Sequence, residues 1–139
     1  MGSNFSELAS SWLAKALIDL ASAEKLSAGT HPILETAVYH CQQAAEKALK
    51  GYLAFRGSRI QKTHDITALL ESASQFDHEF QDWLSIGDRL TFYGTGFRYP
   101  SEIEPLEKEE AEKAIVDTKL LIAIIQKKLN LLDFQKHQP

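Results

Sequence analysis

The sequence predicts an all-α protein, an up-and-down bundle of four long or medium helices plus one shorter helix. Apolar residues recur every three or four positions over long segments, which is the spacing of one helix face. The 4 prolines and most of the 7 glycines lie between these segments, where they can end helices. No segment shows the sustained apolar–polar alternation that is typical of a strand. Helices joined by short links are therefore expected to pack as a bundle.

Composition bounds the class of protein. With 139 residues, 44% hydrophobic and 24% charged, the chain is expected to form one globular domain over 1–139, frayed at 1–4 and 134–139. The single cysteine excludes an intramolecular disulfide, and we expect a cytoplasmic protein. No apolar run approaches the roughly 20 residues of a membrane span, and no signal peptide is expected. The net charge of −4 does not favour nucleic acid over the whole surface.

The first predicted helix covers about 5–26, and Asn4 with Glu7 can form a capping box at its start. Asp19 falls inside the apolar arc of this helix, where a carboxylate without a partner is costly. A Tyr, His or Lys of a neighbouring helix can supply that partner; alternatively, Asp19 positions a binding site. Ile18 falls on the polar side and is a candidate contact with another chain.

The central predicted helix, about 33–55, is rich in Ala, Leu, Gln, Glu and Lys, which are strong helix formers. Its apolar side consists largely of small residues, so another helix can approach closely. Its other side carries a polar stripe at spacings of three and four, formed by Thr36, His40, Gln43, Lys47 and Lys50. This polar stripe is either a solvated face or a ligand-binding face.

The segments after the central helix are shorter. Gly57 and Ser58 are expected to end that helix, and Thr63 to cap a helix whose buried side runs over 66–76. Asp65 would favour the positive end of the same helix.

A further segment, capped by Asp77, is expected to end near Tyr93. Residues 94–100 contain two glycines and a proline, which predicts a loop. The last helix is expected from Pro105 or Glu107 to about 132, with acids in its first turns and lysines near its end.

Basic residues are distributed unevenly. Five of them, with no acid among them, lie over 47–64 and could hold an anion locally: Lys47, Lys50, Arg56, Arg59 and Lys62. In the predicted loop, Arg98 and Tyr99 suit anion contact and stacking; alternatively, Arg98 pairs with a nearby Glu. The five histidines show no ligand spacing on one helix, so neither a metal nor a cofactor is expected.

Several local patterns together resemble the HEPN domain, the helical module named for nucleotide binding in higher eukaryotes and prokaryotes. They are the run from Gln43 to Lys50 (Gln-Ala-Ala-Glu-Lys-Ala-Leu-Lys), Thr63-His64-Asp65 and Arg98-Tyr99-Pro100, preceded by Ala16-Leu17-Ile18-Asp19-Leu20. The resemblance extends from about Trp12 to Ile125. It implies a helical bundle that is often homodimeric and that works beside a minimal nucleotidyltransferase. It also implies that some members are RNase toxins of toxin–antitoxin pairs.

The chain departs from the RNase members of this family at one point. Those members carry an Arg followed, after four to six intervening positions, by a His near the start of the last long helix. Here neither Arg89 nor Arg98 has its His. Arg59 and His64 fit the spacing by count, but they lie in the connector before the third helix. The sequence leaves open whether the chain is an enzyme.

Three functions remain open. The first is a ligand-binding module in which six side chains converge on a nucleotide or RNA, namely Gln43, Lys47, Lys50, His64, Arg98 and Tyr99, with Asp19 and Asp65 as structural support. The second is a metal-independent RNase that uses His64 with Arg59 or Arg98. The third is a pure protein-interaction module, a homodimer bound to a nucleotidyltransferase, with Ile18, Phe92, Tyr93 and Phe97 as candidate contacts. Alternatively, Gln43, Lys47, His64 and Asp65 only tie two helices together.

Overall fold

A computed structural model describes residues 4–59, 61–95 and 105–137, with the side chains of 4–6 left out. The elements are α1 (Asn4–Ser27), α2 (Leu34–Phe55), α3 (Ile66–Ser74), the 3-10 helix η1 (His78–Trp83), α4 (Leu84–Thr95) and α5 (Lys108–Lys136). These described ranges contain no strand. The predicted all-α bundle is therefore confirmed, with α1, α2 and α5 as the long helices.

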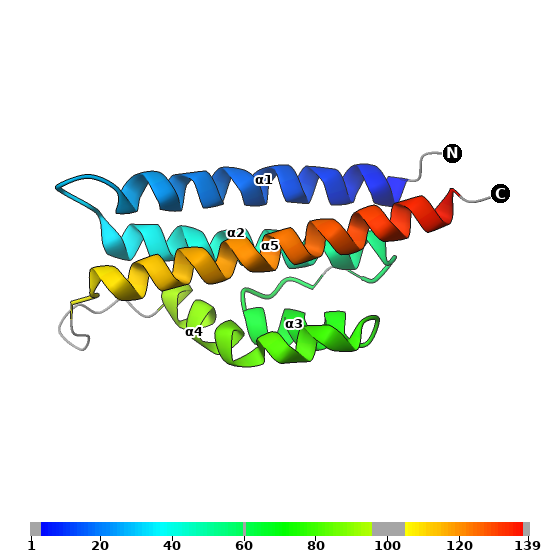
Figure 1. The fold of residues 1–139 in the computed structure, drawn as a ribbon. Helices are drawn as coiled ribbons and strands as arrows, with labels where there is room; N and C mark the ends of the chain where they lie inside the picture. Colours follow the sequence, from blue (N-terminus) through cyan, green and yellow to red (C-terminus); the bar gives the residue numbers. More distant parts are fainter. Residues whose placement is uncertain (1–3, 60, 96–104, 138–139) are drawn as a thin grey trace.

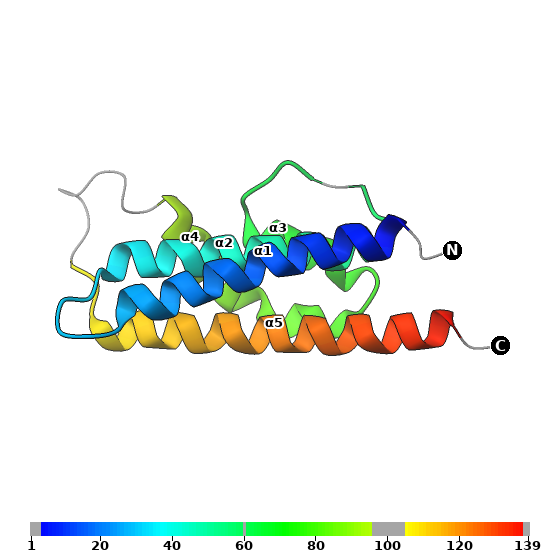
Figure 2. The same ribbon diagram turned by 90° about the horizontal axis from the view of Figure 1, so that it is seen from above.

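The central helix is α2, which contacts α1, α3, α4 and α5. The chain runs along α1, turns, and returns antiparallel along α2, as Figure 1 shows. After α2, a connector runs back along the bundle to the start of α3. The end of α4 and the start of α5 lie at the same end of the bundle. Seen from above, α5 runs in the same direction as α2 and lies beside α1 (Figure 2). No helix in the described part of the chain has the length and apolar character needed to cross a membrane.

Small residues let α1 approach α2 closely. Ala44, Ala45 and Ala48 are fully buried, as the sequence indicated for the apolar side of this helix. A Cβ atom added at Gly51 would lie 3.1 Å from Trp12 Cβ and 3.2 Å from a backbone oxygen of α1. The absence of a side chain at position 51 therefore sets how near the two helix axes come.

Helix boundaries follow the capping chemistry, with two corrections. Asp65, not Thr63, caps α3: its carboxylate accepts a hydrogen bond from the backbone of Ala68 at 3.2 Å. Thr63 Oγ1 instead accepts from the backbone N–H of Asp65 at 3.1 Å, which fixes the turn just before the cap. Asp77 caps η1, as predicted. The last helix continues to Lys136, four residues past the predicted end at about 132.

Candidate functional site

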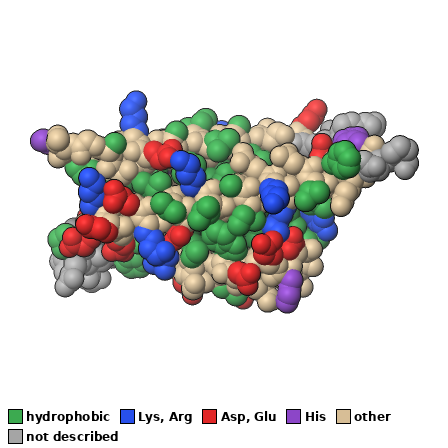
Figure 3. Space-filling model, viewed as in Figure 1, with side chains coloured by type: hydrophobic (Ala, Val, Ile, Leu, Met, Phe, Trp, Pro, Cys, Tyr) green, Lys and Arg blue, Asp and Glu red, His purple; other side chains and the backbone are tan. Residues whose placement is uncertain are grey.

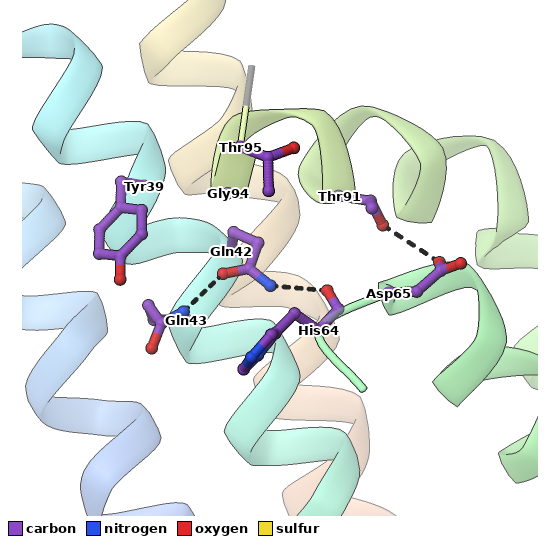
Figure 4. Close-up of a pocket in the computed structure, with 8 residues that line it drawn as sticks. All are labelled: Tyr39, Gln42, Gln43, His64, Asp65, Thr91, Gly94 and Thr95. Carbon is purple, nitrogen blue, oxygen red and sulfur yellow. Dashed lines mark hydrogen bonds between the residues drawn. The ribbon is translucent and has the colours of Figure 1, made fainter. Parts of the chain in front are cut away.

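A hollow of about 310 Å³ opens between α2, the end of the connector and the last turns of α4. Most of the residues that line it have polar side chains; the lining consists of Tyr39, Gln42, Gln43, His64, Asp65, Thr91, Gly94 and Thr95. Figure 4 shows the side chains of α2 on one side of this hollow and the residues of α4 above it, with His64 below Gln42 and Asp65 under Thr91. Three segments that are distant in sequence thus meet at one place.

The floor of the hollow is the buried amide of Gln42. Its nitrogen donates to the backbone oxygen of His64 at 2.9 Å and to Glu46 Oε1 at 3.1 Å, and its oxygen accepts from Gln43 at 2.7 Å. The backbone of Gly94 packs directly against this amide, because a Cβ atom added at Gly94 would lie 2.9 Å from Gln42 Cδ. The amide thus ties α2 to the connector and leaves the side chain of Gln43 at the rim.

Below the hollow, Glu46 is the centre of a buried polar cluster. Its carboxylate accepts hydrogen bonds from Gln42, from His64 Nδ1 at 2.9 Å and from Lys50 Nζ at 2.9 Å. Burial raises the pKa of Glu46, but the hydrogen bonds from Lys50, His64 and Gln42 outweigh it, and the net shift is downward. The carboxyl group is therefore ionised at neutral pH and acts only as an acceptor.

His64 combines a fixed ring nitrogen with an exposed ring. Since the ionised Glu46 can only accept, Nδ1 of His64 carries the proton in their hydrogen bond. The side chain is 77% exposed, so the opposite edge of the ring, with Nε2, is open to solvent. Glu46 thus holds the imidazole in one tautomer and one orientation. A fixed imidazole of this kind can donate, accept or transfer a proton at Nε2.

The two lysines expected to bind ligand are both held by carboxylates. Lys50 is buried beside Glu46, and its ammonium also lies 5.8 Å from the centre of the Trp12 ring. It does not lie on an exposed face, because α1 crosses α2 at this level and covers it. Lys47 donates to Asp19 at 2.6 Å, and His40 contacts the same carboxylate at 2.8 Å. The pairing predicted for Asp19 is thus present, with partners from the neighbouring helix.

The other predicted residues divide into three groups. Gln43, His64 and Asp65 come together at the hollow. Arg59 is exposed on the connector. Arg98 and Tyr99 lie outside the described residues; the described part of α4 ends at Thr95 on the rim.

Of the two arginines that lie in the region where the family places its RNase motif, Arg89 is described in the structure and Arg98 is not. Its guanidinium donates to the buried carboxylate of Asp117 at 3.0 Å, and Lys113 lies 3.4 Å from the same oxygen. Arg89 thus links α4 to α5, away from the hollow. No group of three or more His, Cys, Asp or Glu side chains within the described ranges could hold a metal ion.

Sequence reasoning missed Gln42, Glu46, Tyr39 and Thr91. A signal for two of them is visible in retrospect, because Gln42, Glu46 and Lys50 are spaced by four and form one row along the helix. Thr91 could not be found in this way, since its hydroxyl reaches Asp65 and the backbone of Ile66 only through the tertiary fold.

Comparisons with known proteins agree with this fold. The model of the HEPN domain matches residues 9–129. The crystal structure of TT1696 from Thermus thermophilus is similar, with a TM-score of 0.75 and 28% sequence identity over 86% of this chain and 97% of that one. No curated protein matches the sequence.

Proposed function

Since the chain belongs to the HEPN domain family, we propose that it is a nucleotide- or nucleic-acid-binding helical module and that the hollow between α2, the connector and α4 receives the ligand. The observation that carries this proposal is the exposed His64 ring, which the buried Glu46 holds at the edge of a polar hollow. A hollow of about 310 Å³ lies at the lower end of the sizes typical of small-molecule sites.

The chemistry of the lining suits a nucleobase or a ribose better than a phosphate. The amide of Gln43 offers both donors and an acceptor, which match the edge of a base, and Tyr39 offers a half-exposed ring for stacking. No Lys or Arg lies among the described lining residues, and Asp65 adds negative charge. The proposal therefore assigns phosphate contacts to Arg98 and Tyr99, which come shortly after the lining residue Thr95 in the sequence. Lys47 and Lys50 instead fix the side chains of Asp19 and Glu46.

The proposal includes a homodimer that works with a minimal nucleotidyltransferase. Membership of the family supports this part, as the resemblance led us to expect. It is tested by co-expression with a nucleotidyltransferase encoded beside this chain, followed by purification through a tag on one partner. A complex that survives gel filtration is expected, and separate elution of the two proteins would contradict it.

Ligand binding is tested by heat unfolding with a panel of nucleotides and short RNAs. A ligand at about 100 times its dissociation constant should add about 2.7 kcal/mol of stability, which is seen as a raised midpoint. The shift should be lost in Gln43→Ala and His64→Ala. It should persist in the matched control variants Gln81→Ala and His78→Ala, whose exposed side chains lie on η1. No shift with any ligand, or equal losses in the control variants, would refute a site in the hollow.

A metal-independent RNase is the second candidate, and the pair formed by His64 and Glu46 is the observation that favours it. A carboxylate that fixes one imidazole nitrogen leaves the other free for proton transfer, and the exposed Arg59 on the same connector could stabilise a phosphate. Cleavage of RNA that is lost in both His64→Ala and Arg59→Ala would support this activity. Cleavage that survives His64→Ala would exclude it.

A further inference from the structure

A second hollow, of about 240 Å³, lies near the C-terminal ends of α2 and α5. Its lining comes from the end of α2, the turn between α3 and η1, and the final turns of α5, which Figure 1 shows at the same end of the bundle. The lining residues are Tyr52, Arg56, Phe76, Asp77, Lys128, Leu131, Leu132 and Gln135. This second hollow shares no residue with the hollow at His64, so what it binds is independent of the proposed function.

The hydroxyl of Tyr52 opens into the second hollow. Tyr52 is 1% exposed, and its ring packs edge-on against Phe80, with 4.8 Å between the ring centres. No group in the described part of the chain forms a hydrogen bond with this hydroxyl, yet the oxygen is not among the fully enclosed polar atoms there that lack a partner. A buried phenol normally has a hydrogen-bond partner, so this one indicates a ligand that enters the hollow.

Arg56 brings a cation to the same hollow. Its guanidinium lies over the ring of Phe76, 5.0 Å from the ring centre. Within the described ranges no carboxylate forms an ion pair with it. Lys128, by contrast, is held by the carboxylates of Asp77 and Glu79. Of the two cations that line this hollow, Arg56 is therefore the one whose donors remain for a ligand.

The hydroxyl of Tyr52 and the guanidinium of Arg56 are neighbours at the end of α2. The two residues are four positions apart, which is one helical turn. Burial raises the pKa of Tyr52, and the positive charge of Arg56 opposes that rise, so the two groups are within electrostatic reach of each other. A planar carboxylate can accept two N–H groups of a guanidinium and a phenol O–H at the same time.

The charges around the second hollow favour a ligand with one negative charge. Because Asp77 and Glu79 balance Lys128, a dianion would gain the attraction of Arg56 alone and would face two carboxylates. Figure 3 shows basic side chains interspersed with acidic and hydrophobic ones over the described part of the face on which α5 lies in front. Such a surface does not favour a polyanion such as RNA.

The remaining wall of the hollow is largely apolar. Phe76 and Leu131 are 40% and 52% exposed, and Leu132 lies beside them in the lining. The volume of 240 Å³ equals that of about eight water molecules and is below the range of drug-sized ligands. We propose that the second hollow binds a small organic acid, with its single carboxylate on Arg56 and Tyr52 and its apolar body against Phe76, Leu131 and Leu132.

The first test is a nuclear magnetic resonance titration of the ¹⁵N-labelled chain with benzoate. The Nε–H signal of Arg56 and the backbone signals of Phe76 and Asp77 should move most. The side-chain amides of Gln42 and Gln43, in the other hollow, should not move. Benzamide has the same shape without the charge and should bind at least about 10-fold more weakly. Equal binding of benzamide, tighter binding of inorganic phosphate, or largest shifts away from the second hollow would refute the proposal.

Two variants separate the contributions of the two donors. Tyr52→Phe removes the hydroxyl but keeps the buried ring, and it should weaken benzoate binding about fivefold. Arg56→Gln should weaken it at least about 10-fold. Lys62→Gln is the matched control, because it removes one positive charge from an exposed position on the connector, and it should bind benzoate as the wild type does. Wild-type affinity in Tyr52→Phe or Arg56→Gln would overturn the assignment, and so would an equal loss in Lys62→Gln.

Discussion

The buried cluster under the hollow makes a quantitative prediction for Glu46→Gln. The substitution keeps the size of the side chain but removes its charge, and the ammonium of Lys50 is then left without its counter-ion. The side chains of Glu46 and Lys50 are 6% and 8% exposed, so water cannot replace the lost partner. Breaking a buried ion pair by removing one member typically costs about 3 kcal/mol, and we expect a loss of this size at pH 7.

The assay is urea unfolding followed by circular dichroism. With a slope of about 2 kcal/mol per M, a loss of about 3 kcal/mol lowers the midpoint by about 1.5 M. Glu24→Gln is the matched control, because it removes the same charge from an ion pair with Lys119 whose side chains are 44% and 64% exposed. Surface pairs of this kind contribute about 0.5 kcal/mol or less. Equal midpoints for the two variants would refute the buried cluster.

The pH dependence of this difference has a definite sign. The pKa of Glu46 is lower in the folded protein than its ordinary value of 4.5, because hydrogen bonds from Lys50, His64 and Gln42 outweigh the effect of burial. The ionised carboxylate therefore stabilises the folded state fully above pH 4.5, and this contribution is lost as the pH falls through the lowered pKa. The difference in the free energy of unfolding between wild type and Glu46→Gln should therefore shrink below pH 4.5. A difference that stays constant down to acid unfolding would contradict the lowered pKa of Glu46 in the folded protein.

Three further predictions concern the bundle. Gly51→Val should lower the stability by about 2 kcal/mol in heat unfolding, because its Cβ would press on Trp12; an unchanged midpoint would show that the two helices separate freely. Burial raises the pKa of Cys41 to about 12, so this thiol should react with a disulfide reagent at pH 8 only when the protein unfolds; rapid reaction of the native protein would contradict this. Lys128→Met should cost about 1 kcal/mol by removing the ion pair with Asp77, and 1 M salt should reduce that cost; an equal cost at both salt concentrations would point to lost packing instead.

Local patterns in the sequence predicted the helices because the periodicity of apolar residues and the capping residues are local properties of the chain. A single carboxylate in an apolar arc, Asp19, was enough to predict a partner on a neighbouring helix, and Asp77 was recognised as a cap from its position alone. The polar stripe was harder to interpret. Gln43 and Lys50 are seven residues apart and share one side of α2, yet Gln43 lies at the rim of the hollow and Lys50 is buried.

The reason for this difference is tertiary. Trp12 covers the level of Lys50, and the connector returns along the bundle so that His64 reaches Glu46. A helical pattern shows which residues share a face, but it does not show which part of that face another segment will cover. The polar cluster around Glu46 was missed for this reason, and with it the group that orients His64.

The most direct test of the proposed site is a nuclear magnetic resonance titration of the ¹⁵N-labelled protein with the nucleotide or RNA that gives the largest thermal shift. The account predicts that the side-chain amide signals of Gln42 and Gln43 and the backbone signals of Thr91 and Gly94 move first and furthest, because these groups line the hollow. Largest changes along the outward face of α5, with the amides of Gln42 and Gln43 unmoved, would contradict it.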